Sequence, residues 1–298
     1  MKTMKHLDLF TGIGGFKLAA EWSGFETVAF CEVNDWCDEH ALKENWPDIP
    51  NLKDVRKLCR RIHHILEANE ETEYDPDYLE CNICEVDFGE CDCIGTDQFL
   101  DTYGGIDLIT AGVPCQPASI IGKRKGADDA RWLWPDTLRI VGELEPTWVV
   151  CENPTGLLTL DKGDRFDEIL KGFHEIGYDC WWETLPATSV GAGHRRERVW
   201  LVAYSRSQGL ERHAWNGNSL DRPHRGETGK AGPTASEIVF PLRDTSEWWK
   251  DQSPVPVVVD GVSDPSFWKE AVIATGNAIV PQVAYSILKS IAELTERA

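Results

Sequence analysis

A cysteine in a rigid turn is the first residue of this chain whose position indicates chemistry. Cys115 lies in the segment Gly112-Val113-Pro114-Cys115-Gln116-Pro117, directly after an apolar run at residues 106–111. That run predicts a buried strand, and the active sites of α/β proteins lie at the carboxyl ends of their strands. A thiol there becomes a nucleophile when a helix N-terminus or a nearby cation lowers its pKa from about 8.5. Taken alone, the turn favours the alternative of an ordinary packed cysteine.

An acid and two arginines add to this pattern. Residues 148–151 also read as a buried strand, and they lead into Glu152-Asn153-Pro154. Further along, Arg196 and Arg198 are two residues apart, so that on an extended strand both side chains point to one face. Guanidinium groups bind anions and polarised oxygens. The sequence therefore predicts a nucleophile, a carboxyl group and a pair of cations at one site.

A glycine-rich turn between two predicted strands indicates a nucleoside site. Residues 5–10 predict a strand that runs into Thr11-Gly12-Ile13-Gly14-Gly15 and a helix, and a second strand at 27–31 ends at Glu32. Glycines let a ligand approach the backbone, and an acid at the end of the second strand binds ribose hydroxyls. The spacing is not G-x-G-x-x-G, which disfavours a dinucleotide. A tight turn with an incidental acid is the alternative.

The elements that must position these residues alternate between strands and helices. Strands are expected at 5–10, 27–31, 106–111, 148–151 and 198–204, with helices at 16–22, 131–145, 165–176 and about 280–296. This alternation predicts an α/β fold with a mostly parallel sheet. Residues 205–233 are rich in Ser, Gly, Asn, His and Arg and predict a loop-rich region.

Taken together, the motifs resemble those of the cytosine-5 DNA methyltransferases, in that family's usual order. They are Asp8-Leu9-Phe10-Thr11-Gly12-Ile13-Gly14-Gly15-Phe16, Pro114-Cys115-Gln116, Glu152-Asn153, the segment from His194 to Arg198, and Gly276-Asn277-Ala278. The resemblance implies a Rossmann-like S-adenosylmethionine-dependent methyltransferase domain and a small loop-rich target-recognition domain. Residues 1–204 would form the catalytic and cofactor-binding domain, 205–271 the target-recognition domain, and 272–298 a C-terminal helix returning to the first domain.

The resemblance also implies a role for each matched residue in the transfer of a methyl group to cytosine C5. Cys115 would attack C6 of a flipped cytosine, Glu152 would contact N3 and the exocyclic amine, and Arg198 would hold O2. Arg196 would steady that network or a nearby phosphate. The residues implied for the cofactor are Phe10, Gly12, Gly14, Gly15, Glu32 at the ribose, Asp54 at the adenine amino group, and Asn277 and Ala278 closing the pocket. The chain departs from the family pattern at His194, where glutamine is usual, and in having no arginine at 257–274.

Charge is distributed unevenly along the chain. The formal net charge is −20, and residues 67–101 hold 13 Asp or Glu with no Lys, Arg or His. This segment belongs to an acidic insert at about 60–102, which we expect to point away from DNA. Residues 195–230 carry eight Lys or Arg against four acids, and Lys123-Arg124-Lys125 follows the catalytic turn. Both cationic segments are candidates for phosphate contacts.

Four cysteines of the insert are spaced as zinc ligands can be. Cys81, Cys84, Cys91 and Cys93 form two close pairs, which can wrap four thiolates around one Zn²⁺. The alternative is four reduced thiols on a solvated loop.

The expected partner is double-stranded DNA, with the protein acting as a monomer in the cytoplasm and without a membrane. The apolar runs are far shorter than the ~20 residues that span a bilayer, and the first 12 residues lack the apolar core of a signal peptide. Three alternatives stay open: the same chemistry on tRNA, a catalytically silent DNA-binding homologue, and an NAD-dependent oxidoreductase, which the glycine spacing disfavours.

Overall fold

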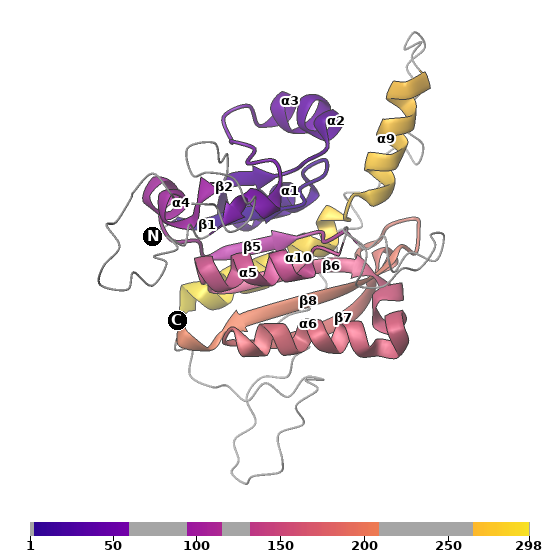
Figure 1. Ribbon diagram of the computed structural model, residues 1–298. Coiled ribbons are helices and arrows are strands. Elements are labelled where there is room, and N and C mark those ends of the chain that lie inside the picture. Colours follow the sequence, from indigo (N-terminus) through magenta and orange to yellow (C-terminus); the bar gives the residue numbers. More distant parts are fainter. Residues whose placement is uncertain (1–2, 60–93, 115–131, 209–264, 298) are drawn as a thin grey trace, which may run out of the picture.

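A single six-stranded sheet forms the centre of the molecule (Figure 1). The computed structural model describes residues 3–59, 94–114, 132–208 and 265–297. The strands lie in the order β2-β1-β5-β6-β8-β7. Their bounds are β1 Met4–Leu9, β2 Phe25–Cys31, β5 Leu108–Ala111, β6 Trp148–Pro154, β7 Tyr178–Pro186 and β8 Glu197–Ser205. The predicted α/β class is therefore confirmed.

The direction of β8 decides where the site can form. β2, β1, β5 and β6 are parallel, whereas β8 is antiparallel to both β6 and β7. The start of an antiparallel strand lies beside the end of its neighbour, and Arg198 is accordingly paired with Pro154. The arginine segment thus reaches the edge at which the parallel strands end. β7 is a strand that the sequence analysis did not predict.

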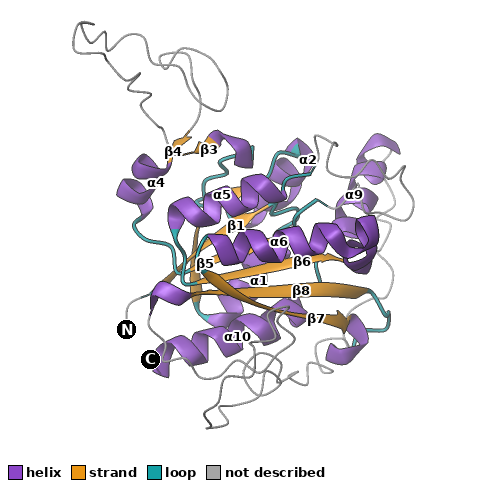
Figure 2. Ribbon diagram, turned by 60° about the horizontal axis from the view of Figure 1, so that its bottom comes forward, coloured by secondary structure: helices purple, strands orange, loops and turns teal. Residues whose placement is uncertain are grey.

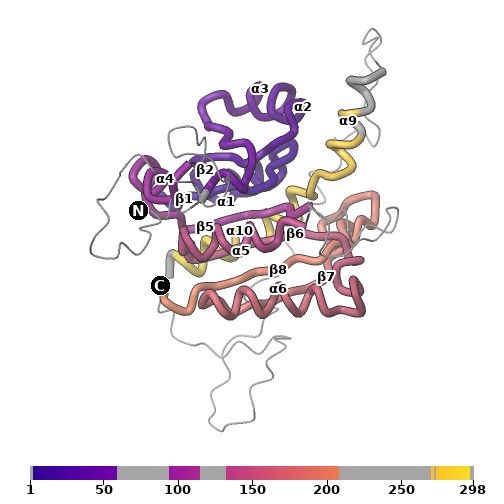
Figure 3. Tube along the Cα trace, in the orientation of Figure 1, coloured from indigo at the N-terminus to yellow at the C-terminus, as the bar shows by residue number. Residues whose placement is uncertain are grey.

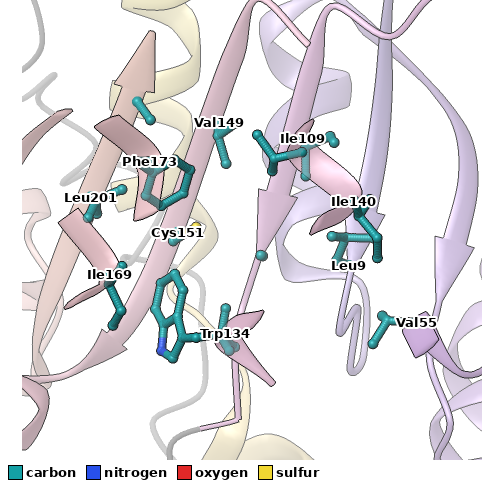
Figure 4. Packing of buried hydrophobic residues seen from close by; sticks show 14 of the residues in the cluster. Leu9, Val55, Ile109, Trp134, Ile140, Val149, Cys151, Ile169, Phe173 and Leu201 are labelled. Carbon is teal, nitrogen blue, oxygen red and sulfur yellow. The ribbon is translucent and has the colours of Figure 1, made fainter. Parts of the chain in front are cut away.

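Helices cover both faces of the sheet (Figure 2). One face carries α4 Thr96–Tyr103, α5 Trp134–Leu144 and α6 Asp164–Glu175, and the other carries α1 Gly15–Ser23 and α10 Pro281–Arg297. Their apolar side chains make two buried clusters, one on each side of the strands. The first cluster brings Phe173 of α6 and Ile140 of α5 onto Cys151, Val149 and Ile109 (Figure 4). β5 is buried at every residue, and β6 at every residue except Pro154, because both of their faces are covered.

Shorter elements complete the fold at its edges. After β2 the chain forms α2 Asp35–Cys37, a π-helical turn Asp38–Leu42, α3 Lys43–Asn45 and a 3-10 turn Val55–Lys57. A two-residue strand β3, Leu58–Cys59, pairs in parallel with β4, Ile94–Gly95. Further 3-10 turns lie at Thr155–Gly163, Ala187–Val190 and Arg206–Gln208. Residues 94–103, at the end of the predicted insert, form β4 and α4, whose Phe99 is buried in the first cluster.

The C-terminal helices connect distant parts of the chain. α9, Pro265–Asn277, extends away from the sheet, and α10 then runs back behind the strands in the view of Figure 3. Val283, Ile287 and Ile291 of α10 pack in the second cluster with Phe16 and Ala20 of α1. The last helix therefore belongs to the same body as the first strands. No helix in the described ranges is long and apolar enough to cross a membrane.

Candidate active site

One edge of the sheet gathers most of the predicted site residues that the structure describes. β1 and β2 end just before Phe10 and Glu32, β5 leads to Pro114, and β6 carries Glu152 near its end. The start of β8 adds Arg198, because that strand runs antiparallel to β6. Segments separated by more than 100 residues in the sequence therefore meet here, at the edge where α/β proteins bind ligands.

Glu152 is a buried carboxyl group at this edge. The residue is 6% exposed, and Arg198 Nε lies 3.0 Å from its Oε1. Burial raises the pKa of Glu152 to about 7, and the positive charges of Arg198 and Arg196 offset part of that effect. The Arg198 guanidinium is the partner that the structure gives Oε1, which is itself buried. Each carboxyl oxygen has more than one lone pair, so Glu152 can accept a further hydrogen bond beside this pairing.

Arg196 reaches the C-terminal segment. Its Nη1 donates to the carbonyl oxygen of Gly276 at 2.8 Å, and its Nη2 donates to the carbonyl oxygen of Ala278. The backbone of Arg196 has a φ of +21°, a value that side-chain-bearing residues rarely adopt. One guanidinium thus joins the start of β8 to the Gly276-Asn277-Ala278 motif. The sequence contains no local indication of this contact, because the partners are about 80 residues apart.

The glycine turn is enclosed on two sides. A Cβ on Gly14 would lie 2.3 Å from Cζ3 of Trp46, and a Cβ on Gly15 would lie 2.6 Å from Cγ1 of Ile279. Ile279 follows the Gly276-Asn277-Ala278 motif, so the C-terminal segment meets the first turn of the chain. Gly12 has a φ of +59° and no atom within 4 Å of its Cβ position. The turn is therefore tight at Gly14 and Gly15 and open at Gly12.

Gly14→Ala is expected to lower the free energy of unfolding by about 2–4 kcal/mol. The φ of +86° costs a side-chain-bearing residue about 1 kcal/mol, and the clash with Trp46 adds the cost of overpacking, about 1–3 kcal/mol. Gly24→Ala is the matched control, because Gly24 has a φ of +90° and nothing within 4 Å of its Cβ position. Denaturant unfolding of both variants measures the difference. Equal destabilisation would show that Trp46 does not constrain the turn.

The Glu32 carboxylate accepts backbone hydrogen bonds from the glycine turn and from the segment that follows β2. Its Oε2 accepts from the N–H of Gly12 at 2.6 Å, and its Oε1 accepts from the N–H of Asn34 at 2.7 Å. Burial raises the pKa of Glu32, and these two hydrogen bonds offset part of that effect. Each oxygen has a further lone pair, so the carboxylate can still accept hydroxyl groups. Val33 follows directly and is 67% exposed, which places an apolar side chain in solvent beside the acid.

Asp54 is engaged by a neighbour within its own turn. Its Oδ1 accepts from the backbone N–H of Arg56 at 3.0 Å, and the Arg56 guanidinium pairs with the carboxylate. This pairing lowers the pKa of Asp54. Arg56 is not among the residues predicted for the site.

A buried polar network lies behind the glycine turn and was also missed. His6 Nδ1 lies 2.8 Å from Oγ1 of Thr27, and His6 Nε2 lies 2.7 Å from Oγ1 of Thr110. Thr110 Oγ1 donates to Asp8 Oδ1 at 2.7 Å. Burial raises the pKa of Asp8 to about 8 and lowers that of His6 to about 3. The pattern that could have revealed the network is the i, i+2 spacing of His6 and Asp8 on one face of β1.

Several predicted residues lie outside the described part of the chain. They are Cys115, the cysteines Cys81, Cys84, Cys91 and Cys93, the cations at 123–125, and residues 209–264 of the predicted recognition domain. Their roles stay predictions. In the ranges that are described, no group of three or more His, Cys, Asp or Glu is placed to hold a metal ion.

Comparison with known proteins gives the same assignment as the motifs. The sequence pattern of the C-5 cytosine-specific DNA methylase family matches residues 4–64 and 59–252. The type II methyltransferase M.NgoMIV of Neisseria gonorrhoeae is 32% identical over 242 residues, which is 81% of this chain and 62% of that protein. The type II methyltransferase M.BsuFI of Bacillus subtilis is 31% identical over 256 residues, 85% of this chain and 52% of that protein.

Coverage and fold similarity complete the comparison. The chain spans between about a third and a half of the length of the first curated relatives it matches. A solved structure of the Entamoeba histolytica methyltransferase EhMeth superimposes with a TM-score of 0.56 at 12% identity, over 99% of each chain, and so shares the fold. The family pattern covers well over half of the sequence and leaves no place for the NAD-dependent oxidoreductase alternative. The chain belongs to the C-5 cytosine-specific DNA methylase family.

Proposed function

We propose that this protein is a DNA (cytosine-5-)-methyltransferase that uses S-adenosylmethionine. The observation that carries the proposal is the position of Glu152, a buried carboxyl group with a pKa of about 7 that is paired with Arg198, at the edge that also holds Glu32 and the glycine turn. A carboxyl group with a pKa near 7 can donate a hydrogen bond to a ring nitrogen when it is protonated, or accept one from an amine when it is ionised. This is what recognition of the N3 and amino edge of cytosine requires.

The residues at the edge fit the proposed cofactor. The open side of Gly12 admits a ligand to the backbone, Glu32 has lone pairs for two ribose hydroxyls, and exposed Val33 offers an apolar contact to a purine ring. Asp54 would serve the adenine amino group. When bound, S-adenosylmethionine supplies an electrophilic methyl group. Asn277 and Ala278 would close the site from the C-terminal side, where Arg196 holds their segment.

The protein's own groups account for the remaining chemistry. The Cys115 thiolate would add to C6 of cytosine, so that electron density moves to C5 and toward N3. Glu152 at N3 and Arg198 at O2 would stabilise the developing charge. After C5 gains the methyl group, loss of the C5 proton to a base restores the ring and releases the thiolate from C6. A cytosine inside a duplex cannot reach a buried carboxyl group, so the base must leave the stack.

Double-stranded DNA is the substrate we favour over tRNA. The type II methyltransferases among the relatives support DNA, and residues 209–264 provide a region between β8 and α9 for base readout. We place the protein with the methyltransferases of restriction–modification systems, acting as a cytoplasmic monomer.

The test is transfer of label from S-adenosylmethionine to nucleic acid. The wild-type protein is incubated with labelled cofactor and, in separate reactions, duplex DNA and tRNA, and the labelled base is identified after hydrolysis. Label in 5-methylcytosine of DNA supports the proposal. Label confined to tRNA would move the substrate to RNA, and label in neither nucleic acid would favour the silent homologue.

Arg196→Ala is expected to raise the KM for S-adenosylmethionine about tenfold, because the segment that carries Asn277 loses two hydrogen bonds to a charged group. Arg196→Lys should restore little of the loss, since an ammonium lacks the planar fork that spans two carbonyl oxygens. The neighbouring Arg195→Ala is the control, because Arg195 is exposed and pairs only at the surface with Glu197. Steady-state kinetics measure all three variants. An unchanged KM for Arg196→Ala would show that the C-terminal segment does not depend on this clamp.

Zinc remains a prediction from spacing alone. Metal analysis of the purified protein tests it, with about one zinc per chain expected if Cys81, Cys84, Cys91 and Cys93 bind the ion together.

A further inference from the structure

Asn51 lies between the two acids proposed to bind the cofactor. Its backbone continues the sheet beside β2: the N–H of Phe30 donates to the carbonyl oxygen of Pro50 at 2.9 Å, and the N–H of Leu52 donates to that of Phe30 at 2.7 Å. These two bonds form an isolated parallel bridge between Phe30 and Asn51. Residues 50–52 thus add one short segment to the sheet beside β2.

The side chain of Asn51 continues this pattern of hydrogen bonds along the chain to Glu32. The N–H of Glu32 donates to Asn51 Oδ1 at 2.9 Å, and Asn51 Nδ2 donates to the carbonyl oxygen of Glu32, also at 2.9 Å. A side-chain amide carries the same donor and acceptor as a peptide group. The Asn51 amide therefore replaces the two backbone hydrogen bonds that a further residue pair of the sheet would make. It does so at Glu32, directly after the end of β2.

The same amide also directs the chain toward Asp54. Asn51 Oδ1 accepts a second hydrogen bond, from the N–H of Lys53 at 2.9 Å. Lys53 has a φ of +63°, so the backbone leaves the sheet at this residue. Its Nζ is bound by Asp35 at 2.9 Å and by buried Asp38 at 2.7 Å, which fixes the turn from the other side. Asp54 follows immediately.

We propose that Asn51 is a positioning residue that sets the spacing between Glu32 and Asp54 for the nucleoside part of the cofactor. The inference rests on the proposed function. A single side chain holds both polar groups of the Glu32 backbone and the N–H of the residue before Asp54. Loss of this amide frees the backbone at Glu32 and just before Asp54 at the same time. The hydrogen bonds of Asn51 to Glu32 and Lys53 are to backbone groups, so they do not occupy the Glu32 or Asp54 carboxylate.

The experiment measures how well the protein distinguishes ribose from its deoxy form. Binding of S-adenosylhomocysteine and of its 2′,3′-dideoxyribose analogue is followed by calorimetry for the wild type, Glu32→Gln, Asn51→Ala and Asn51→Asp. The wild type should prefer the ribose compound by about 10- to 100-fold, as expected for hydrogen bonds to a carboxylate. Glu32→Gln should lose most of that preference.

Asn51→Ala should lower the preference at least fivefold and weaken binding of the ribose compound roughly tenfold. Asn51→Asp keeps the acceptor for two N–H groups, loses the donor to Glu32 and to Asp38, and adds a negative charge beside them. It reports on the same contact if the alanine variant does not fold. In the double variant with Glu32→Gln, Asn51→Ala should cause no further loss of preference. Asn45→Ala is the matched control, because the Asn45 side chain donates to the carbonyl oxygen of Ala41 at 2.7 Å, within the adjacent helical segment.

The outcomes separate the two claims. Wild-type protein that binds neither compound would overturn the cofactor assignment and this inference with it. Ribose preference that is lost in Glu32→Gln but kept in both Asn51 variants would overturn the inference alone. A purely structural role for Asn51 would weaken both compounds equally and leave their ratio unchanged, which would also contradict the proposal.

Discussion

Cys115→Ala is expected to lower methyl transfer by at least ~10³-fold, to the background of the assay, while cofactor affinity changes by less than about threefold. C5 of cytosine is not nucleophilic until a group adds at C6, and alanine offers no group that can add. The residues proposed to bind the cofactor lie after β1, after β2, at Asp54 and in the C-terminal segment, so they do not require the thiol. The measurement is initial rate with labelled cofactor, together with cofactor binding by calorimetry.

Cys180→Ala is the control for loss of a thiol that has no proposed role. Cys180 lies on β7, and burial raises the pKa of its thiol well above the ordinary value. A second readout is covalent capture on duplex DNA that contains 5-fluorocytosine, since a fluorine at C5 cannot leave as the proton does and the C6 adduct persists. Wild type should form the adduct and Cys115→Ala should not. An adduct formed by the Cys115 variant would assign the nucleophile to another residue.

Glu152→Gln should have the second-largest effect, a fall in kcat of about 10²- to 10³-fold at pH 7, because the amide cannot exchange a proton with the ring. In the wild type, the pKa of about 7 means that the carboxyl group is protonated below that pH and ionised above it. If the protonated form donates to N3, the rate should fall as the pH rises above 7. The variant should show no such step between pH 6 and 8.

Glu152→Gln should raise the stability of the protein at pH 8, although it lowers the activity. Burial raises the folded-state pKa of Glu152 above its usual 4.5, so between these two values the folded protein binds more protons than the unfolded chain. Stability therefore falls as the pH rises from 4.5 to 7, and the glutamine variant lacks this loss. At pH 8 we expect Glu152→Gln to melt at a higher temperature than the wild type while being nearly inactive.

Exposed Glu175 provides the control for this pair of effects, because Glu175→Gln removes a carboxylate that pairs only at the surface with Lys171. Its melting temperature and activity should both match the wild type. A Glu152→Gln variant that is both active and unchanged in its pH profile would remove Glu152 from the chemistry and leave its burial without a functional reason.

Local patterns in the sequence predict the class of fold and most of the residues at the carboxyl ends of the parallel strands. The expected strands at 5–10, 27–31, 106–111, 148–151 and 198–204 all exist within a few residues, and so do the four expected helices. These elements are visible because burial on one or both faces leaves a period in the sequence. β7 was missed, since its exposed and buried residues do not alternate regularly along Tyr178–Pro186.

The sequence by itself determined which residue types stand at the ends of the strands, and so the chemistry expected of Glu152, Arg198, Glu32 and the glycine turn. Only the tertiary structure decided their partners. The antiparallel direction of β8 brought Arg198 to Glu152, and the return of the C-terminal segment gave Arg196 its two carbonyl oxygens. The bridge beside β2 gave Asn51 its hold on Glu32. Spacing along the chain records how each residue faces its own strand or helix, whereas strand direction and contacts between distant segments depend on how those elements pack together.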